Sequence, residues 1–272
     1  MKKIIVITGA SSGMGKAFAL HLIKKGHTVY GLARRVEKMN DIVMAGGKAI
    51  AMDITDEAQV ENAVNQILKE QGKVDVLINN AGYAVYGTVE EVPIDAARRQ
   101  FEVNLFGLAS ITQKIIPGMR ERKSGTIINI SSMGGKMYTP MGAWYHATKH
   151  ALEGWSDCLR VELTPFGVDV VIIEPGGIAT EFGDVFQENL QGDVKNGPYA
   201  ESLRKIIEAT SEMYGNGKLS PPSVITNLID KAVHSKKPKT RYVAGAYAKP
   251  LMFMRKYLGD RQFDKILMKQ FQ

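Results

Sequence analysis

Tyr145 and Lys149 are the residues whose types and spacing point most directly to chemistry, since they stand four positions apart in AWYHATKHALEG. Positions i and i+4 share one face of a helix, so a helix here would put the ammonium one turn from the phenol. A tyrosine of pKa about 10 is a poor proton donor or acceptor near neutral pH, but a nearby cation favours its phenolate. The pair therefore predicts acid–base catalysis by the phenol. An ordinary interface aromatic is the alternative interpretation of Tyr145.

A glycine-rich turn, TGASSGMG at residues 8 to 15, is the second candidate site. Gly9, Gly13 and Gly15 follow a short β-branched run, and a stretch with apolar residues at helical spacing comes next. Glycines at this place let the backbone approach a pyrophosphate, which then lies on the N-terminus of the helix. A plain tight turn, or a different phosphate ligand, is the alternative.

The end of the next apolar run reads Leu32-Ala33-Arg34-Arg35. An acidic residue about 20 positions beyond the glycines would hold the adenosine ribose of NAD, and none is present here. Two guanidinium groups suit a ribose 2′-phosphate instead. We therefore predict that NADP(H) is preferred, unless the two arginines belong to a solvated basic loop.

The elements that must position these residues are strands alternating with helices. Strands are expected in the ranges 2–10, 27–33, 48–54, 74–80, 125–131, 167–175 and 240–246, with helices over 58–72 and about 95–120 among those between them. Strands that are apolar on both faces indicate a parallel sheet covered on both sides. The predicted fold class is α/β, a doubly wound Rossmann-type parallel sheet of about seven strands with helices on both faces.

A single domain over residues 1–272 is the expected organisation, because no linker, repeat or low-complexity tract interrupts the 272 residues, of which 44% are hydrophobic. Residues 181–216 break the alternation and are interpreted as a substrate loop or lid insertion. Their apolar side chains are Phe182, Phe186, Leu190, Met213 and Tyr214. After them, Ser220 before Pro221 predicts a helix N-cap.

With the glycine turn, NNAG at residues 79–82 and the YHATK pair, the chain resembles the short-chain dehydrogenase/reductase family in its single-domain form. The resemblance covers about residues 3–180, and the remainder agrees only in the order of strands and helices. It implies an NAD(P)-dependent oxidoreductase that moves a hydride between nicotinamide and a secondary alcohol or ketone. Assembly as a homodimer or homotetramer through the two long helices that flank strands four and five is also implied.

The resemblance assigns four catalytic residues. Tyr145 would be the general acid/base, and Lys149 would lower its pKa and bind the nicotinamide ribose. Ser132, thirteen residues before Tyr145, would orient the substrate oxygen, whereas Ser131 is off by one position. Asn104 would support a water-mediated proton relay. Taken singly, Ser132 could be a cap and Asn104 a helix-interior hydrogen-bonding residue.

Cofactor contacts follow from the same resemblance. Asp53 would meet the adenine, although an aspartate at a strand end is as often a cap. Ser12 stands where some NADP-preferring relatives carry a basic residue, so NAD(H) remains possible beside NADP(H). The full predicted set is Gly9, Ser11, Ser12, Gly13, Met14, Gly15, Arg34, Arg35, Asp53, Ile54, Asn80, Ala81, Gly82, Tyr145, Lys149, Pro175, Gly176, Ile178 and Thr180.

Other reactive side chains have simpler interpretations. His146 is adjacent to Tyr145, and neighbouring residues on a helix point about 100° apart, so a structural role is expected. Cys158 follows the apolar pattern of its helix and is expected in the core. The histidines show no metal-ligand spacing, so no metal is predicted.

The charge is uneven along the chain. The net charge is +7, yet residues 231–272 carry eleven Lys and Arg against two Asp, which gives +9 for that end alone. Residues 249–272 read as a basic helical segment that closes the substrate pocket or packs in an oligomer, with contact to an anionic membrane as the less favoured interpretation. No nucleic-acid recognition motif accompanies the charge, so nucleic acid is not an expected partner.

No apolar run approaches the length of about 18 residues that a spanning helix needs, and no secretion signal is recognisable, so the expected location is cytoplasmic. The expected substrate is a small carbonyl or alcohol compound, with a lipophilic ketone, steroid-like or long-chain, suggested by the apolar insertion. The competing hypothesis is a non-catalytic sensor or scaffold that binds the dinucleotide without turnover.

Overall fold

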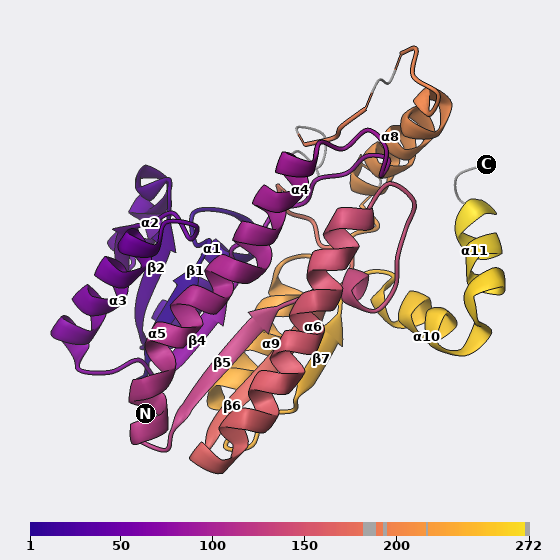
Figure 1. Ribbon diagram of the computed structural model, residues 1–272. Coiled ribbons are helices and arrows are strands. Elements are labelled where there is room, and N and C mark those ends of the chain that lie inside the picture. The colour runs from indigo at the N-terminus through magenta and orange to yellow at the C-terminus, as the bar shows by residue number, and fades with distance from the viewer. Residues whose placement is uncertain (182–188, 193–194, 216, 270–272) are drawn as a thin grey trace.

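Seven parallel strands form one sheet at the centre of the computed structural model (Figure 1), which describes residues 1–181, 189–192, 195–215 and 217–269. The strand order is β3-β2-β1-β4-β5-β6-β7, so the predicted doubly wound α/β fold is confirmed. The strands are β1 (Ile4–Thr8), β2 (Thr28–Ala33), β3 (Lys48–Ala51), β4 (Val76–Asn79), β5 (Gly125–Ile130), β6 (Val168–Pro175) and β7 (Arg241–Ala244).

Helices connect these strands and cover both faces of the sheet. The α-helices are α1 (Gly13–Lys24), α2 (Asn40–Met44), α3 (Glu57–Gln71), α4 (Ile94–Phe101), α5 (Leu108–Glu121), α6 (Ala143–Leu163), α8 (Ala200–Gly215), α9 (Ser223–His234), α10 (Ala248–Leu258) and α11 (Asp260–Lys269). Short 3₁₀ turns are η1 (Val36–Met39), η3 (Met133–Gly135) and η4 (Thr164–Phe166), and η2 (Glu102–Gly107) is a π-helical turn.

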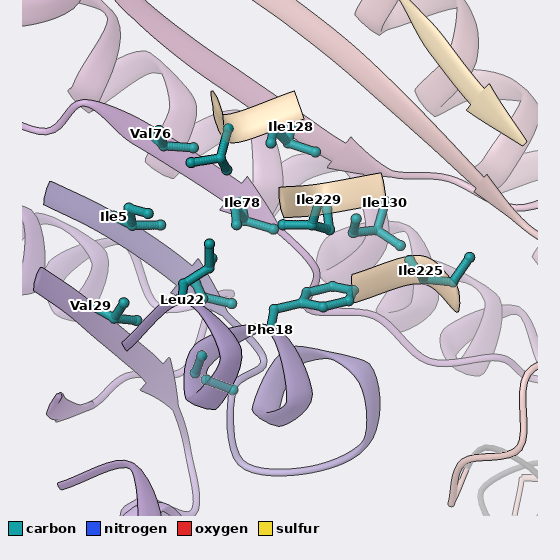
Figure 2. Packing of buried hydrophobic residues seen from close by; sticks show 14 of the residues in the cluster. Ile5, Phe18, Leu22, Val29, Val76, Ile78, Ile128, Ile130, Ile225 and Ile229 are labelled. Atoms are coloured by element: carbon teal, nitrogen blue, oxygen red, sulfur yellow. The ribbon is translucent and has the colours of Figure 1, made fainter. Parts of the chain in front are cut away.

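Alternation along the strands explains the two-sided core. Ile5 and Ile7 of β1 pack with α1 and α9 on one face, while Ile4 and Val6 pack with α3, α5 and α6 on the other. Figure 2 shows the first of these clusters, in which Phe18 of α1 and residues of α9 meet side chains from β1, β4 and β5. Since successive side chains of a strand point to opposite faces, an all-apolar strand buries both of its faces only between two helical layers.

The order of the strands sets the position of the site. After β1 the chain turns to β2 and β3 on one side, and later crosses back to β4 on the other side of β1. Parallel sheets of this kind bind ligands in the crevice at the carboxyl ends of the strands where the order reverses. The glycine turn after β1 and the NNAG segment after β4 both lie at that point.

The long helix predicted around residues 95–120 consists of α4, η2 and α5 in succession. A π-helical turn inside an α-helix often marks a functional position. Asn104 lies in this turn and is buried.

Two predictions about local structure were wrong. Ser220 is not the N-cap of α9, which begins at Ser223 after Pro222. The backbone of Ser220 instead bonds to Gly177 and Ala179, so the chain is extended there. Cys158 is exposed on α6 rather than in the core, because its neighbours on the helix, Leu152 and Leu159, take the buried face.

The insertion at 181–216 is described only in part. Phe182 and Phe186, and the side chains of Met213 and Tyr214, lie outside the described residues. Leu190 forms a bridge with Tyr86, and the hydroxyl of Tyr199 donates to Glu90 at 2.8 Å. The insertion is therefore tied to the segment that follows β4.

The C-terminal helices α10 and α11 lie beyond the β7 edge of the sheet (Figure 1). Phe263 and Leu267 are buried with Met137, and Leu251 and Met254 pack against the same small cluster. The basic end of the chain thus covers the segment that follows β5. Within the described ranges, no helix is both long and apolar enough to cross a bilayer.

Candidate active site

A cavity of about 590 Å³ opens at the carboxyl edge of the sheet between the ends of β1, β2 and β4. Cavities that bind small molecules typically measure about 300–1,000 Å³. Of the predicted cofactor residues, the cavity is lined by Gly9, Ser11, Ser12, Gly13, Met14, Arg34, Arg35, Asp53, Ile54, Asn80, Ala81, Gly82 and Thr180. Residues remote in sequence therefore converge on one space.

The glycine turn is built against the NNAG segment. Asn80 Nδ2 donates to the carbonyl oxygens of Thr8 and Gly9, both at 3.1 Å, and the Thr8 hydroxyl accepts from the backbone of Asn80 and Ala81. Gly9 has a φ of +68°, and a Cβ placed on Gly15 would lie within 3.0 Å of the Gly9 oxygen and Asn80 Nδ2. Gly15 is thus required by close packing beneath the turn rather than as part of the cavity wall.

The donors around the cavity fit a phosphate-bearing dinucleotide. Helix α1 starts at Gly13, has no acidic residue in its first turn, and directs its N-terminus at the cavity. Arg34 and Arg35 are exposed at the cavity wall, and within the described residues neither has a carboxylate partner. A helix N-terminus and two guanidinium groups at one cavity together attract anionic phosphate groups.

Asp53 forms part of a charged wall on the same cavity. Its Oδ1 accepts from the backbone and hydroxyl of Thr55, and its Oδ2 accepts from Arg99 at 3.1 Å. Burial works to raise the pKa of Asp53, but the Thr55 hydrogen bonds and the charges of Arg99 and Arg34 bring it below its ordinary value. The carboxylate is therefore ionised and fixed at neutral pH.

Arg99 and Tyr83 line the cavity although the sequence did not single them out. Arg99 lies on α4, remote from every motif, and its side chain reaches Asp53 and Thr55 after β3. Tyr83 directly follows NNAG, and its position next to this motif is the signal that could have predicted it as a cavity residue.

Tyr145 and Ser132 meet beside this cavity. Ser132 follows β5, and its Oγ accepts from the backbone N–H of Gly134 at 3.0 Å. Burial raises the pKa of the Tyr145 phenol, and a hydrogen bond with Ser132 acts in the opposite direction. The phenol is consequently protonated at neutral pH, and Lys149, expected to lower this pKa, is not among the groups that shift it. The ring of Tyr86 lies 5.8 Å from that of Tyr145, centroid to centroid.

Lys149 is buried one turn along α6 from Tyr145. Its Nζ donates to the Ile130 carbonyl at 2.9 Å and lies 6.0 Å from the centroid of the Tyr145 ring. Burial lowers the pKa of Lys149 to about 8, while the charge of Glu153 raises it. Lys149 can therefore gain and lose a proton near neutral pH.

Asn104 reaches the same place from the π-helical turn. Its amide exchanges hydrogen bonds with the backbone of Tyr83, at 3.0 and 2.9 Å, and Nδ2 also contacts Thr148 Oγ1 at 3.1 Å. A Cβ placed on Gly82 would lie 3.1 Å from Asn104 Oδ1 and 3.8 Å from Lys149 Nζ. Asn104, Gly82 and Lys149 are thus brought together.

The residues after β6 are divided between the core and the cavity. Thr180 lines the cavity across from Gly13, whereas Pro175 pairs with Ala244 and Gly176 packs closely on Ala246 and Ala248. The side chain of Ile178 belongs to the core, so only its backbone is available to a ligand.

His146 is held in a structural role, as expected. Its Nε2 accepts from the Thr139 backbone N–H at 3.0 Å, which leaves Nδ1 to donate to the Gly134 carbonyl at 2.9 Å. Burial lowers the pKa of His146 to about 4. The neutral imidazole therefore fastens residues 134–139 to α6. Elsewhere among the described residues, no group of three or more His, Cys, Asp or Glu side chains could hold a metal ion.

Comparison with known proteins agrees with this geometry. Residues 3–191 match the family model described as short chain dehydrogenase. The chain therefore belongs to the short-chain dehydrogenase/reductase family and is an NAD(P)-dependent oxidoreductase.

Individual relatives cover nearly the whole chain. A 3-ketodihydrosphingosine reductase of Bacteroides thetaiotaomicron is 37% identical over 97% of this chain and 96% of its own. An NADPH-dependent 3-dehydrocapnine reductase of Ornithobacterium rhinotracheale is 38% identical over 97% and 95%. The crystal structure of a short-chain dehydrogenase from Streptomyces avermitilis superposes with a TM-score of 0.81 at 34% identity, covering 97% of each chain. Other solved relatives are complexed with NADP+ or NADH.

Proposed function

We propose that this protein is an NADP(H)-dependent enzyme that moves a hydride between the nicotinamide and a lipophilic ketone or secondary alcohol. The observation that carries the proposal is the meeting of Tyr145, Ser132 and Lys149 beside a cavity lined by the glycine turn, Arg34 and Arg35. The chain lacks none of the residues that proton transfer requires, which supports turnover over a purely sensing role.

The glycine turn, Arg34 and Arg35 would hold the dinucleotide, which would supply the hydride in reduction or accept it in oxidation. In reduction, the Tyr145 phenol donates its proton to the carbonyl oxygen as negative charge develops there, and Ser132 orients that oxygen by a hydrogen bond. Burial keeps the phenol protonated, which suits the acid of a reduction. The product is the secondary alcohol, and Tyr145 is left as a phenolate.

Lys149 restores the proton. As an ammonium one helical turn away it stabilises the phenolate, and its pKa of about 8 lets it exchange protons with solvent near neutral pH. Asn104 fixes the backbone of Tyr83 beside this lysine, which supports a role in holding a proton path open. Oxidation of an alcohol would use the same groups in reverse.

The NADP(H) preference rests on Arg34 and Arg35. Ala33 at the end of β2 offers no carboxylate to ribose hydroxyls, and a pair of guanidinium groups can hold a 2′-phosphate at two points. Asp53 is already bonded to Arg99 and Thr55. NAD(H) remains the secondary cofactor, since Ser12 adds no positive charge to the glycine turn.

The substrate side is predominantly apolar, which supports a lipophilic ketone. Met133, Met137 and Tyr138 follow Ser132 and pack with the apolar residues of α10 and α11. Two of the relatives carry names that specify 3-keto or 3-dehydro compounds, and the first of these compounds has a long alkyl chain. The first of these names favours the long-chain class over a steroid-like one.

A test of the reaction is consumption of NADPH by the purified protein with a panel of short-chain, long-chain and cyclic ketones. Tyr145→Phe should lower kcat by a factor of about 10² to 10⁴, the contribution typical of a positioned acid, and should affect NADPH affinity far less than kcat. Tyr30→Phe removes a hydroxyl that donates to Glu70, away from the site, and should keep full activity. Turnover that survives Tyr145→Phe would refute the assigned role.

We further propose assembly through α4, α5 and α6. Ile94, Phe106 and Trp144 border an apolar groove of about 310 Å³ there, and the first two are more than half exposed. Burying such a surface favours a homodimer. Light scattering should give at least twice the monomer mass, and Phe106→Glu should give the monomer mass with the fold intact. A wild-type monomer would contradict this proposal.

A further inference from the structure

The outward side of α10 combines aromatic and cationic side chains. Lys249, Phe253, Lys256 and Tyr257 fall within about 100° of one another around the helix axis. Phe253 and Tyr257 are each 62% exposed, and their rings lie 4.7 Å apart. Lys256 Nζ lies 5.2 Å from the centroid of the Tyr257 ring. These four residues are named the outer face of α10.

The contacts that hold α10 in place are made by the opposite side of the helix. The outer face is therefore not needed for packing within the chain. Leu251 and Met254 pack on the cluster around Met137 and Phe263. The guanidinium of Arg255 lies 5.1 Å from the centroid of the Tyr138 ring. The outer face is therefore held rigidly in place while its aromatic side chains remain in water.

The charges on α10 and α11 are strongly unbalanced. Both acidic residues have partners, since Asp260 pairs with Arg255 at 2.7 Å and Asp264 accepts from the Tyr138 hydroxyl at 2.8 Å. Over the described residues, five cations of these helices have no carboxylate partner. They are Lys249, Lys256, Arg261, Lys265 and Lys269. On α11 three of these cations share one side with Met268, which is 49% exposed.

We propose that the outer face of α10, together with the cations of α11, binds the surface of an anionic lipid bilayer. A helix that carries Phe and Tyr between lysines can bury its apolar groups at the level of the headgroups while the cations meet lipid phosphates. A second copy of this chain fits less well. A twofold interface sets the same patch against itself and would bring like charges together.

The position of the helices links such binding to catalysis, a step that rests on the proposed function. α10 and α11 cover Met133, Met137 and Tyr138, which directly follow Ser132. A protein bound through this face would hold the substrate side of its site close to the bilayer. A ketone with a long alkyl chain would then reach the site from the lipid phase.

Co-sedimentation of the full-length protein with vesicles tests the proposal. Vesicles of phosphatidylcholine with phosphatidylglycerol should bind the protein, vesicles of phosphatidylcholine alone should bind it weakly, and added salt should release it. Each lysine near an anionic surface strengthens binding about fivefold, so Lys249→Gln/Lys256→Gln should weaken it about twenty-five-fold. Phe253→Ser/Tyr257→Ser should weaken vesicle binding about tenfold or more.

Matched controls separate this surface from net charge and from catalysis. Lys24→Gln/Lys25→Gln removes the same charge at the exposed end of α1 and should bind vesicles as the wild type does. Tyr145→Phe should also bind normally, so failure of the proposed reaction leaves the vesicle result intact. Circular dichroism and light scattering check that the α10 variants keep their fold and mass.

Several results would overturn the proposal. The first is that the protein does not bind anionic vesicles at low salt. The second is that the α1 control loses as much vesicle binding as the α10 variants. The third is that the α10 variants change the oligomeric mass instead of vesicle binding. Tighter binding of a single-stranded oligonucleotide than of anionic vesicles would assign the surface to nucleic acid.

Discussion

The cofactor side and the substrate side of the site are held in different ways. On the cofactor side, the glycine turn, the end of β2 and the NNAG segment are joined by hydrogen bonds that involve the backbone, such as Asn80 to the Thr8 and Gly9 carbonyls. On the substrate side, residues 133–139 are held by side chains, namely His146 of α6 and the apolar residues of α10 and α11. Hydrogen bonds of the backbone suit a cofactor whose phosphate groups do not change. Contacts between side chains leave the sequence of the substrate side free to vary.

A fall in pH should destabilise the substrate side more than the cofactor side, and this is the largest effect that we expect. Neutral His146 accepts from Thr139, and protonation would place a second N–H against that donor. Its folded-state pKa is about 4 against 6.5 for the free group, so the folded state binds fewer protons. Stability is therefore complete above about pH 6.5 and is lost as the pH falls towards about 4, by about 3 kcal/mol in total.

Urea unfolding of the wild type and of His146→Gln across this pH range measures the loss. The variant should be less stable at pH 8 but should lose less stability in acid. Hydrogen exchange at pH 5 should show residues 134–139 opening before the glycine turn. The pKa of His27 is also lowered, by burial and by His234, so the variant keeps part of the acid sensitivity. Parallel pH curves for the two proteins would contradict the role given to His146.

Close packing on the cofactor side should make it intolerant of a single methyl group. Gly15→Ala would bring a Cβ within 3.0 Å of the Gly9 oxygen and Asn80 Nδ2. We expect a stability loss of about 2 kcal/mol, and a loss of dinucleotide binding because the turn must shift. Thermal unfolding with and without NADPH measures both effects.

Gly154→Ala is the matched control for that prediction. Gly154 lies in α6 with nothing near its Cβ position, so alanine should stabilise the protein by about 0.5–1 kcal/mol through helix propensity. If Gly15→Ala behaved like Gly154→Ala, the packing argument for the turn would fail.

The same contrast explains how much could be predicted from the sequence. The sheet was predictable because β-branched runs such as 125–131 and 167–175 are buried on both faces. The convergence of the glycine turn, Arg34 and Asn80 on one cavity was predictable because phosphate binding imposes glycines at fixed spacing. Arg99 was missed since only the packing of α4 brings it to Asp53. The starting point of α9 was wrong because Ser220 is used in a bridge to the segment after β6, a tertiary contact that outweighs local capping preference.

The substrate side resisted prediction for a physical reason. The segments that we propose as its walls, residues 133–139 and helices α10 and α11, are distant in sequence and meet through apolar contacts that carry no motif. Cys158 shows the same limit, because one position on a helix decides between the core and solvent.

The central claim is that Arg34 and Arg35 make this family member prefer NADP(H) over NAD(H), and fluorescence titration with NADPH and NADH tests it most directly. We predict that NADPH binds at least tenfold tighter, or about 1.4 kcal/mol, and that Arg34→Ala/Arg35→Ala removes this margin with NADH affinity unchanged. Equal affinities in the wild type would contradict the role of the two arginines, and failure to bind either cofactor would contradict the assignment of the site itself.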